Sequence, residues 1–194
     1  MTLLDWRRRV AAMYAEVRAS AERDPAGTVG RFRIERDRLF RDHPESPLAS
    51  EARGGFRGIP YWPYEPAMRF EADVEALPAE SITATSLSGE AFRLERIGRV
   101  RLPIGELEVY WMAVYGGGVL IPFRDATSGT ETYGAGRYLL DTIKGADLGG
   151  SGDRLVLDFN YAYHPSCAYD PKWSCPLSPP ANRLEVPVTA GERR

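Results

Sequence analysis

Two stretches of the chain are rich in side chains that donate or accept hydrogen bonds, which are the groups that bind a ligand or transfer a proton. The first spans residues 122–138 and the second spans residues 158–183. Neither follows the alternation of a half-buried strand or the three- and four-residue spacing of an amphipathic helix. We expect the functional groups in these two stretches, and we expect both to line one shared pocket.

The first stretch contains the groups best suited to an anion. Arg124 and Arg137 carry forked guanidinium donors that match a carboxylate or a phosphate. A structural alternative stays open, because Asp125 and Glu131 could neutralise the two arginines as buried ion pairs. The further candidate ligand-binding residues in this stretch are Asp125, Ser128, Glu131 and Tyr133.

The second stretch contains the candidate acid–base residues. Asp158 and Asn160 lie two positions apart, so both would share one face of an extended strand. Buried polar side chains are costly unless they are hydrogen-bonded, so they indicate either a ligand or an internal network. A buried carboxylate beside tyrosines has a raised pKa and can act as a general base. We assign Asp158 and His164 as candidate catalytic residues, and Asn160 and Tyr163 as candidate ligand-binding residues.

Three interpretations are open for His164, Cys167 and Cys175. A zinc site lacks a fourth clustered ligand, and the spacing matches no common zinc knuckle. A Cys167 thiol activated by His164 requires the two side chains to face each other, which residues three apart on a proline-containing loop need not do. We favour side-by-side packing of the two thiols, or a disulfide between them. We expect no metal and no cofactor.

The elements that must position these groups begin with two helices in residues 1–45. The apolar residues from Leu3 to Val17 recur every three or four positions, which predicts the first helix. A second helix is predicted from about residue 30 to residue 42, with Phe32, Leu39 and Phe40 inward and the charged residues between Arg31 and Arg38 in solvent. Residues 46–66 are dense in proline and aromatic residues and predict an irregular arm wrapped over the body.

From residue 67 the apolar period changes to two, which marks strands. The predicted strands are 70–74, 92–95, 99–102, 107–115, 119–123, 137–141, 154–159 and 184–188. Closely spaced strands joined by turns, without helical periods between them, favour antiparallel pairing. We therefore predict one α+β domain over residues 1–194, with the helix pair packed on an antiparallel β-barrel or sandwich formed by the β-rich body, residues 67–194.

Composition limits the classes of function. The chain has 194 residues, with 25 Lys and Arg against 27 Asp and Glu, whereas nucleic-acid binders usually carry a basic excess. No apolar run approaches the roughly 20 residues of a membrane span, and no apolar stretch of a signal peptide follows the arginines at residues 7–9. We expect a cytoplasmic protein that contacts neither nucleic acid nor membrane, and a homodimer stays an open alternative.

The sequences "PFRDATSGTETYGAGRYL" and "LDFNYAYHPSCAYDPKWSCPLSPPANRLEVPVTAGE" resemble the two signature stretches of DUF1684, a bacterial and archaeal family of unknown function. The helix pair and "HPESPL…FRGIPYWPYEP" resemble the N-terminal half of that family, so the likeness covers nearly the whole chain. One departure is His164, a position where Asn is common in the family pattern. The resemblance implies no particular activity.

The function expected first is the binding of a small polar or anionic metabolite in a barrel pocket, with Arg124 and Arg137 holding the negative group. The first alternative is a cofactor-independent enzyme, a hydrolase or lyase, that uses Asp158 or His164 as acid or base. The second alternative is a structural or partner-binding protein whose aromatic arm at residues 61–64 contacts another chain.

Overall fold

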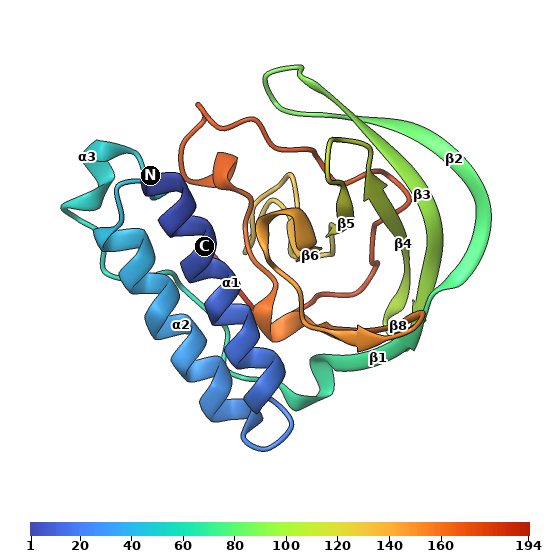
Figure 1. The fold of residues 1–194 in the computed structure, drawn as a ribbon, viewed down its shortest axis with the longest axis horizontal. Helices are drawn as coiled ribbons and strands as arrows, with labels where there is room; N and C mark the ends of the chain where they lie inside the picture. The colour runs from blue at the N-terminus through green and yellow to red at the C-terminus, as the bar shows by residue number, and fades with distance from the viewer.

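Two long helices begin the chain, and both follow from its apolar spacing (Figure 1). This computed structural model describes residues 1–194, in which α1 spans Thr2–Ser20 and α2 spans Pro25–Asp42. The buried residues of α1 are Val10, Met13, Tyr14 and Val17, which confirms the predicted helical face except at its start, where Leu3 is 56% exposed. In α2 the three predicted inward residues, Phe32, Leu39 and Phe40, are buried.

The second helix begins before its predicted start at residue 30. Asp24 is its N-cap, and the Asp24 carboxylate accepts a hydrogen bond of 3.1 Å from the backbone N–H of Gly27. Pro25 occupies the first helical position, where its missing N–H leaves no hydrogen bond unmade. A short third helix, α3 (Ser50–Arg53), interrupts the arm that follows.

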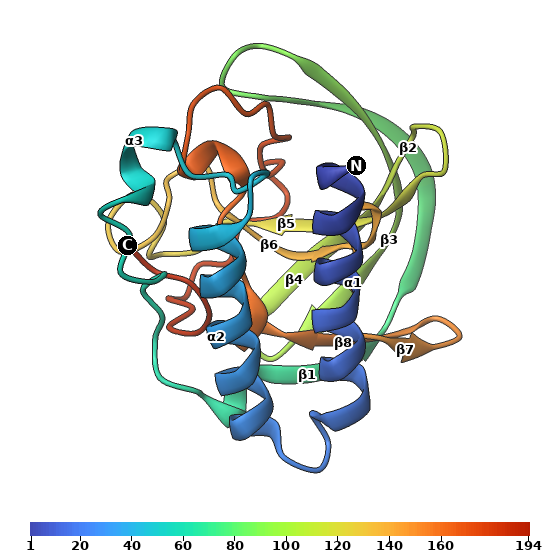
Figure 2. The same ribbon diagram turned by 60° about the vertical axis from the view of Figure 1, so that its left-hand side comes forward.

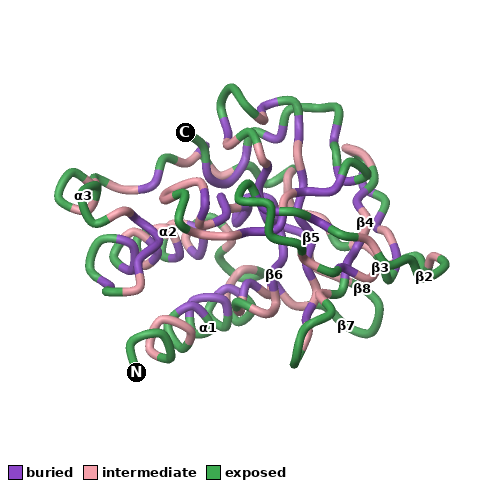
Figure 3. Tube along the Cα trace, turned by 90° about the horizontal axis from the view of Figure 1, so that it is seen from above, coloured by how far each residue is buried: buried purple, intermediate pink, exposed green.

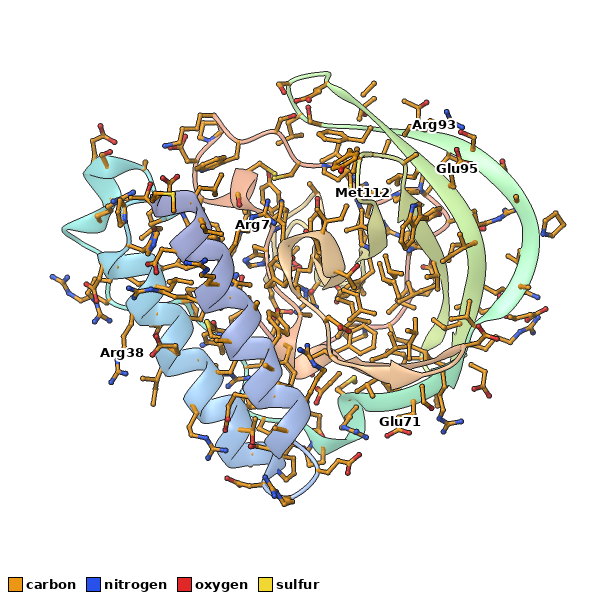
Figure 4. The ribbon with its side chains drawn as sticks, in the orientation of Figure 1. Arg7, Arg38, Glu71, Arg93, Glu95 and Met112 are labelled. Atoms are coloured by element: carbon orange, nitrogen blue, oxygen red, sulfur yellow. The ribbon has the colours of Figure 1, made fainter.

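The two long helices lie side by side against the strands (Figure 2). Two arginines of α1 attach it to the body of the molecule. The guanidinium of Arg7, which points toward the body in Figure 4, donates to the backbone oxygen of Ile143 at 2.8 Å, and that of Arg18 donates to the backbone oxygen of Asp147 at 2.6 Å. Neither long helix has the length of apolar residues that a membrane crossing requires.

The strands form two separate antiparallel sheets. The five-stranded sheet has the order β2-β3-β4-β5-β6, and the three-stranded sheet has the order β1-β8-β7. The strands are β1 (Arg69–Asp73), β2 (Glu75–Thr85), β3 (Ala91–Leu102), β4 (Gly105–Met112), β5 (Gly118–Phe123), β6 (Arg137–Asp141), β7 (Gly150–Ser151) and β8 (Arg154–Asp158). Five short 3-10 or α turns complete the elements: α3, η1 (Pro66–Met68), η2 (Thr142–Lys144), η3 (Phe159–Tyr161) and η4 (Ser166–Ala168).

The five-stranded sheet curves strongly but does not close into a barrel (Figure 1). Register shifts interrupt its pairing between Ala76 and Glu80, and again between Arg96 and Gly98, and such bulges bend a strand. Closure would require β2 to pair with β6, but beyond its pairing with β5 the strand β6 makes only isolated bridges, from Tyr138 to Tyr163 and from Asp141 to Ala146. The α+β class is confirmed, and the barrel is replaced by two open antiparallel sheets.

Several strand predictions need correction. The sequence pattern does not predict β2, because most of its side chains are exposed and its apolar residues do not alternate regularly with polar ones. The strands predicted at 92–95 and 99–102 are one strand, β3, whose alternation is broken by a bulge. The strand predicted at 107–115 ends at Met112 and is not buried on both faces, since Trp111 is 41% exposed. Residues 184–188 form no strand, although Leu184 and Val188 are buried.

The core lies between the helix pair and the sheets, where buried residues concentrate in Figure 3. The C-terminal segment, residues 176–194, runs through this region without regular secondary structure and contributes Leu184, Val188 and Ala190 to the core. The arm is tied to this segment, because the backbone N–H of Trp62 donates to the backbone oxygen of Gly191 at 3.1 Å.

Candidate functional site

Arg137 is a buried structural anchor, since it is 1% exposed and both of its Nη atoms donate to groups of the protein interior. Its Nη2 donates to Asp125 Oδ2 at 2.7 Å and to the backbone oxygen of Val188 at 2.8 Å. Its Nη1 donates to the backbone oxygens of Ala190 at 2.5 Å and Glu192 at 3.1 Å. The guanidinium therefore holds the C-terminal segment in the interior.

Asp125 completes the same network and closes the turn after β5. Its Oδ1 accepts hydrogen bonds from the backbone N–H of Thr127 at 2.9 Å and from the Thr127 hydroxyl at 2.5 Å, and the Ser128 hydroxyl accepts from the backbone N–H of Asp125 at 3.1 Å. The buried ion pair considered as the structural alternative is thus present between Asp125 and Arg137. Glu131 lies at the surface and pairs with neither predicted arginine.

A second buried network centres on Glu192. Its Oε1 accepts from Arg36 Nε at 2.6 Å, and its Oε2 accepts from the backbone N–H of His164 and from the Tyr169 hydroxyl, each at 2.7 Å. The prediction that Arg36 is in solvent is wrong, because Arg36 is only 7% exposed. Arg38 on the same helix does face outward, as Figure 4 shows.

His164 is held in a neutral form beside this network. Its Nε2 accepts a hydrogen bond of 3.3 Å from the backbone N–H of Tyr133, and its Nδ1 lies 3.6 Å from Glu192 Oε2. Burial lowers the pKa of His164 to about 4, although the Glu192 carboxylate opposes this shift. His164 lines a small cavity of about 60 Å³ together with Arg36, Tyr163 and Tyr169.

Tyr163 and Tyr133 belong to the same region. The Tyr163 hydroxyl donates to Asp141 Oδ2 at 3.4 Å, and the Tyr133 hydroxyl donates to the backbone oxygen of Cys167 at 3.4 Å. Cys167 and Cys175 are buried free thiols that no disulfide joins, and a hydrogen bond from Cys167 lowers the pKa of Cys175. The structure contains no group of three or more His, Cys, Asp or Glu side chains arranged to hold a metal ion.

Arg124 lies in a different place, at the wall of a groove of about 640 Å³. The groove lies between the β2–β4 part of the five-stranded sheet and residues 177–183. Two hydrogen bonds fix the backbone of Arg124 in this groove wall. The backbone N–H of Arg124 donates to the backbone oxygen of Asn182, and the backbone oxygen of Arg124 accepts from the N–H of Leu184. The Arg124 side chain makes no hydrogen bond or ion pair, and its Nε is buried without a partner.

Asp158 lines a third cavity, of about 380 Å³, near the end of α1. β8 ends at Asp158 and residues 159–161 form η3, so Asp158 and Asn160 do not share a strand face as predicted. Asp158 Oδ1 accepts from the backbone N–H and from the Nδ2 of Asn160, each at 2.9 Å, and no hydrogen bond occupies Oδ2. Burial raises the pKa of Asp158, and the two bonds from Asn160 oppose this rise.

Asn160 has a structural task. Its Oδ1 accepts from the backbone N–H of Glu65 and its Nδ2 donates to the backbone oxygen of Glu65, each at 2.9 Å, which ties the arm to η3. The cavities beside Arg124, Asp158 and His164 share no lining residue. The structure therefore distributes the predicted residues over separate sites instead of one shared pocket.

Sequence reasoning missed three residues of these sites. The sequence does indicate that Arg36 is buried, because its four-residue spacing from both Phe32 and Phe40 places it on the buried face of α2. Tyr161 follows Asp158 closely in sequence, but only the turn of η3 brings it to the cavity wall. Nothing in the sequence indicates that Glu192 is buried, since a carboxylate beside a glycine and two arginines near the C-terminus is typical of an exposed tail.

The chain is similar to proteins without an established activity. No curated protein matches it. Among solved structures it resembles the solution NMR structure of an uncharacterized protein from Haloarcula marismortui, with 35% sequence identity, a TM-score of 0.60, and coverage of 88% of this chain and 95% of that chain. Residues 54–193 match the family model described as "Protein of unknown function (DUF1684)". The chain therefore belongs to the DUF1684 family.

Proposed function

We propose that this protein binds a small anionic metabolite in the groove beside Arg124. The observation that carries the proposal is the Arg124 guanidinium, which has no protein partner although its Nε is buried in the groove wall. A buried donor without an acceptor costs about 1–3 kcal/mol, and more when it is charged. An oxygen of a bound carboxylate or phosphate would supply the missing acceptor.

The charges around the groove support an anion. Arg96 is neutralised, because its Nη1 lies 2.9 Å from Glu80 Oε2 and 3.1 Å from Glu108 Oε1. Arg183, on the same groove, lies 3.7 Å from the carboxylate of Glu185, and both of these side chains are more than half exposed. Arg124 is thus the cation of the groove that no carboxylate neutralises.

The size and the apolar part of the groove support a metabolite larger than a single inorganic ion. A volume of about 640 Å³ falls within the range of small-molecule sites. Ile82 and Leu177 line it beside the prolines at 179 and 180, which could contact the carbon skeleton of a ligand. Arg137 is not included in this site, since its donors are occupied in the interior.

The proposal is tested by titrating the protein with inorganic phosphate and with succinate in a calorimeter. Arg124→Gln should weaken the binding of the better probe by about ten- to a hundredfold, because a charge-assisted hydrogen bond contributes about 1.5–3 kcal/mol. Arg8→Gln is the matched control, since Arg8 is an exposed arginine of α1 without an ion pair. Failure of both anions to bind the wild type, or equal binding by Arg124→Gln, would contradict the proposal.

Acid–base catalysis is a second candidate function, and the geometry favours Asp158 over His164 as its carrier. Asp158 has an unoccupied oxygen, a raised pKa and a cavity beside it. His164 is neutral, and its Nε2 already accepts a backbone N–H. Turnover of a bound compound that is lost in Asp158→Asn and kept in His164→Asn would support this function. Partner binding by the arm has less support, because Trp62 is buried and Arg33 stacks on the Tyr61 ring.

A further inference from the structure

The cavity at Asp158 is built by one face of the three-stranded sheet. β1 and β8 pair with Arg69 opposite Asp158, and with Glu71 opposite Val156. Alternate residues of a strand point to the same side, so these four side chains share one face. That face and the end of α1, including Arg18, enclose the cavity of about 380 Å³. Figure 4 shows Glu71 on the outer side of β1, away from the core.

The inner wall of this cavity carries two polar groups whose hydrogen bonding is incomplete. Asp158 is 3% exposed, and both bonds from Asn160 reach its Oδ1, which leaves Oδ2 without a donor. Tyr161 is 2% exposed and lines the same cavity, and its hydroxyl has no hydrogen-bond partner. Native proteins pair nearly all buried polar groups, so the unpartnered Tyr161 hydroxyl beside a cavity indicates a ligand, and Asp158 Oδ2 offers that ligand a second contact.

Charge decides which kind of ligand fits. The rim arginines are already neutralised, because Arg69 lies 3.1 Å and Arg154 lies 3.3 Å from oxygens of Glu71. An anion would therefore gain little attraction from these arginines, and the Asp158 carboxylate would repel it. An ammonium group would lose its hydration without meeting an unmatched negative charge, because the three carboxylates that line the cavity, Glu22, Glu71 and Asp158, are matched by three arginines, Arg18, Arg69 and Arg154. A neutral group that donates a hydrogen bond avoids both costs.

We infer that this cavity binds a neutral polyhydroxylated ligand, with one ligand hydroxyl donating to Asp158 Oδ2 and another exchanging a hydrogen bond with the Tyr161 hydroxyl. A sugar or cyclic polyol has adjacent hydroxyl groups that can both donate and accept, which suits an acceptor beside a phenol. The polar side chains of the sheet face provide further partners for its remaining hydroxyls. The inference concerns a site separate from the Arg124 groove, and it holds whether or not a reaction follows binding.

The test is saturation-transfer NMR with D-glucose and myo-inositol as probes. The wild type should bind at least one of them, and Tyr161→Phe should weaken that binding by about tenfold, because one hydrogen bond is lost. Tyr161→Phe should fold normally, since the removed hydroxyl has no partner in the protein. Asp158→Asn, which keeps the size of the side chain, should weaken the same probe.

Two control variants test whether the binding of the probe depends on this cavity. Tyr115→Phe removes a hydroxyl from a fully exposed tyrosine, and it should bind the probe as the wild type does. Arg124→Gln should also leave the binding of the probe unchanged, which distinguishes this site from the anion groove. Absence of binding of both probes to the wild type, or unchanged binding by Tyr161→Phe, would overturn the inference.

Discussion

At the scale of single residues, burial and internal hydrogen bonds decide which polar groups are free to contact a ligand. Arg124 and Arg137 lie in the same polar stretch and offer the same donors. Arg137 is 1% exposed, and its guanidinium donates hydrogen bonds to Asp125 and to three backbone oxygens. The side chain of Arg124, in contrast, has no hydrogen-bond partner. The same contrast separates His164, which is bonded and neutral, from Asp158, which keeps one oxygen unoccupied. Residue type alone does not distinguish the members of either pair.

His164 gives a prediction about stability and pH. Burial lowers its pKa from 6.5 to about 4 in the folded protein, so the folded state disfavours the protonated ring. Between these two values unfolding takes up a proton, and the free energy of unfolding falls as the pH is lowered. The contribution of this residue is complete above pH 6.5 and is lost toward pH 4, and amounts to about 3 kcal/mol.

The comparison for this prediction is His164→Asn, in which an amide oxygen can still accept from the Tyr133 N–H. Urea denaturation at pH 7 and at pH 4.5 measures both proteins. The other titrating groups are present in both, so the difference in their unfolding free energies isolates His164. Relative to the wild type, His164→Asn should therefore be more stable at pH 4.5 than it is at pH 7. An identical pH dependence in the two proteins would show that His164 is not held neutral by the fold.

At the scale of elements, local patterns predicted the helices better than the strands. α1 and α2 bury residues at regular spacing, so each pattern is visible in the sequence. β2 is an edge strand with mostly exposed side chains, and its pairing with β3 rather than its own pattern makes it a strand. Residues 184–188 look like a strand because Leu184, Val186 and Val188 alternate with Glu185 and Pro187, but they pair with no strand, and only the preceding residue, Arg183, makes an isolated bridge, to Arg124.

The turn region between β5 and β6 allows a matched test of backbone strain. Gly129 has a φ of +95° and Gly136 a φ of +98°, a region that residues with a Cβ rarely adopt. A Cβ at Gly129 would meet open space, whereas a Cβ at Gly136 would collide with the backbone oxygen of Phe123. Gly129→Ala should cost about 1–2 kcal/mol from conformation alone.

Gly136→Ala should cost about 1–3 kcal/mol more than Gly129→Ala, because the collision adds to the same conformational cost. Chemical denaturation of both variants beside the wild type measures the difference. The collision also displaces the strand that begins with Arg137, so Gly136→Ala should disturb the Asp125 network while Gly129→Ala leaves it intact. Equal destabilisation by the two substitutions would mean that the backbone moves away from the added methyl group at no cost.

At the scale of the whole molecule, the C-terminal segment holds the layers together. Its backbone oxygens accept from Arg137 of β6, and its Glu192 carboxylate pairs with Arg36 of α2. One irregular segment therefore links the helix layer to the five-stranded sheet. Its buried apolar residues, Leu184, Val188 and Ala190, belong to the same core as both helices.

Removal of residues 188–194 should therefore abolish cooperative unfolding, whereas the loss of an exposed tail would leave it unchanged. The deletion leaves the buried guanidinium groups of Arg36 and Arg137 without most of their partners, and an uncompensated buried charge costs about 3–5 kcal/mol. Removal of Arg194 alone is the control, since this residue is exposed. Circular dichroism during heating measures both proteins. A truncated chain that melts cooperatively at the wild-type temperature would contradict this account of the segment.

The sequence by itself determined the α+β class, the two helices with their buried faces, and the resemblance to DUF1684, because these depend on local periodicity and on long contiguous motifs. Only the tertiary structure decided that the sheets stay open and that Arg124 and Asp158 line separate cavities. It also decided that Glu192, near the end of the chain, is the buried partner of Arg36. The physical reason is that the availability of a polar group depends on contacts between residues distant in sequence, such as the 156 positions between Arg36 and Glu192, and such contacts leave no local pattern.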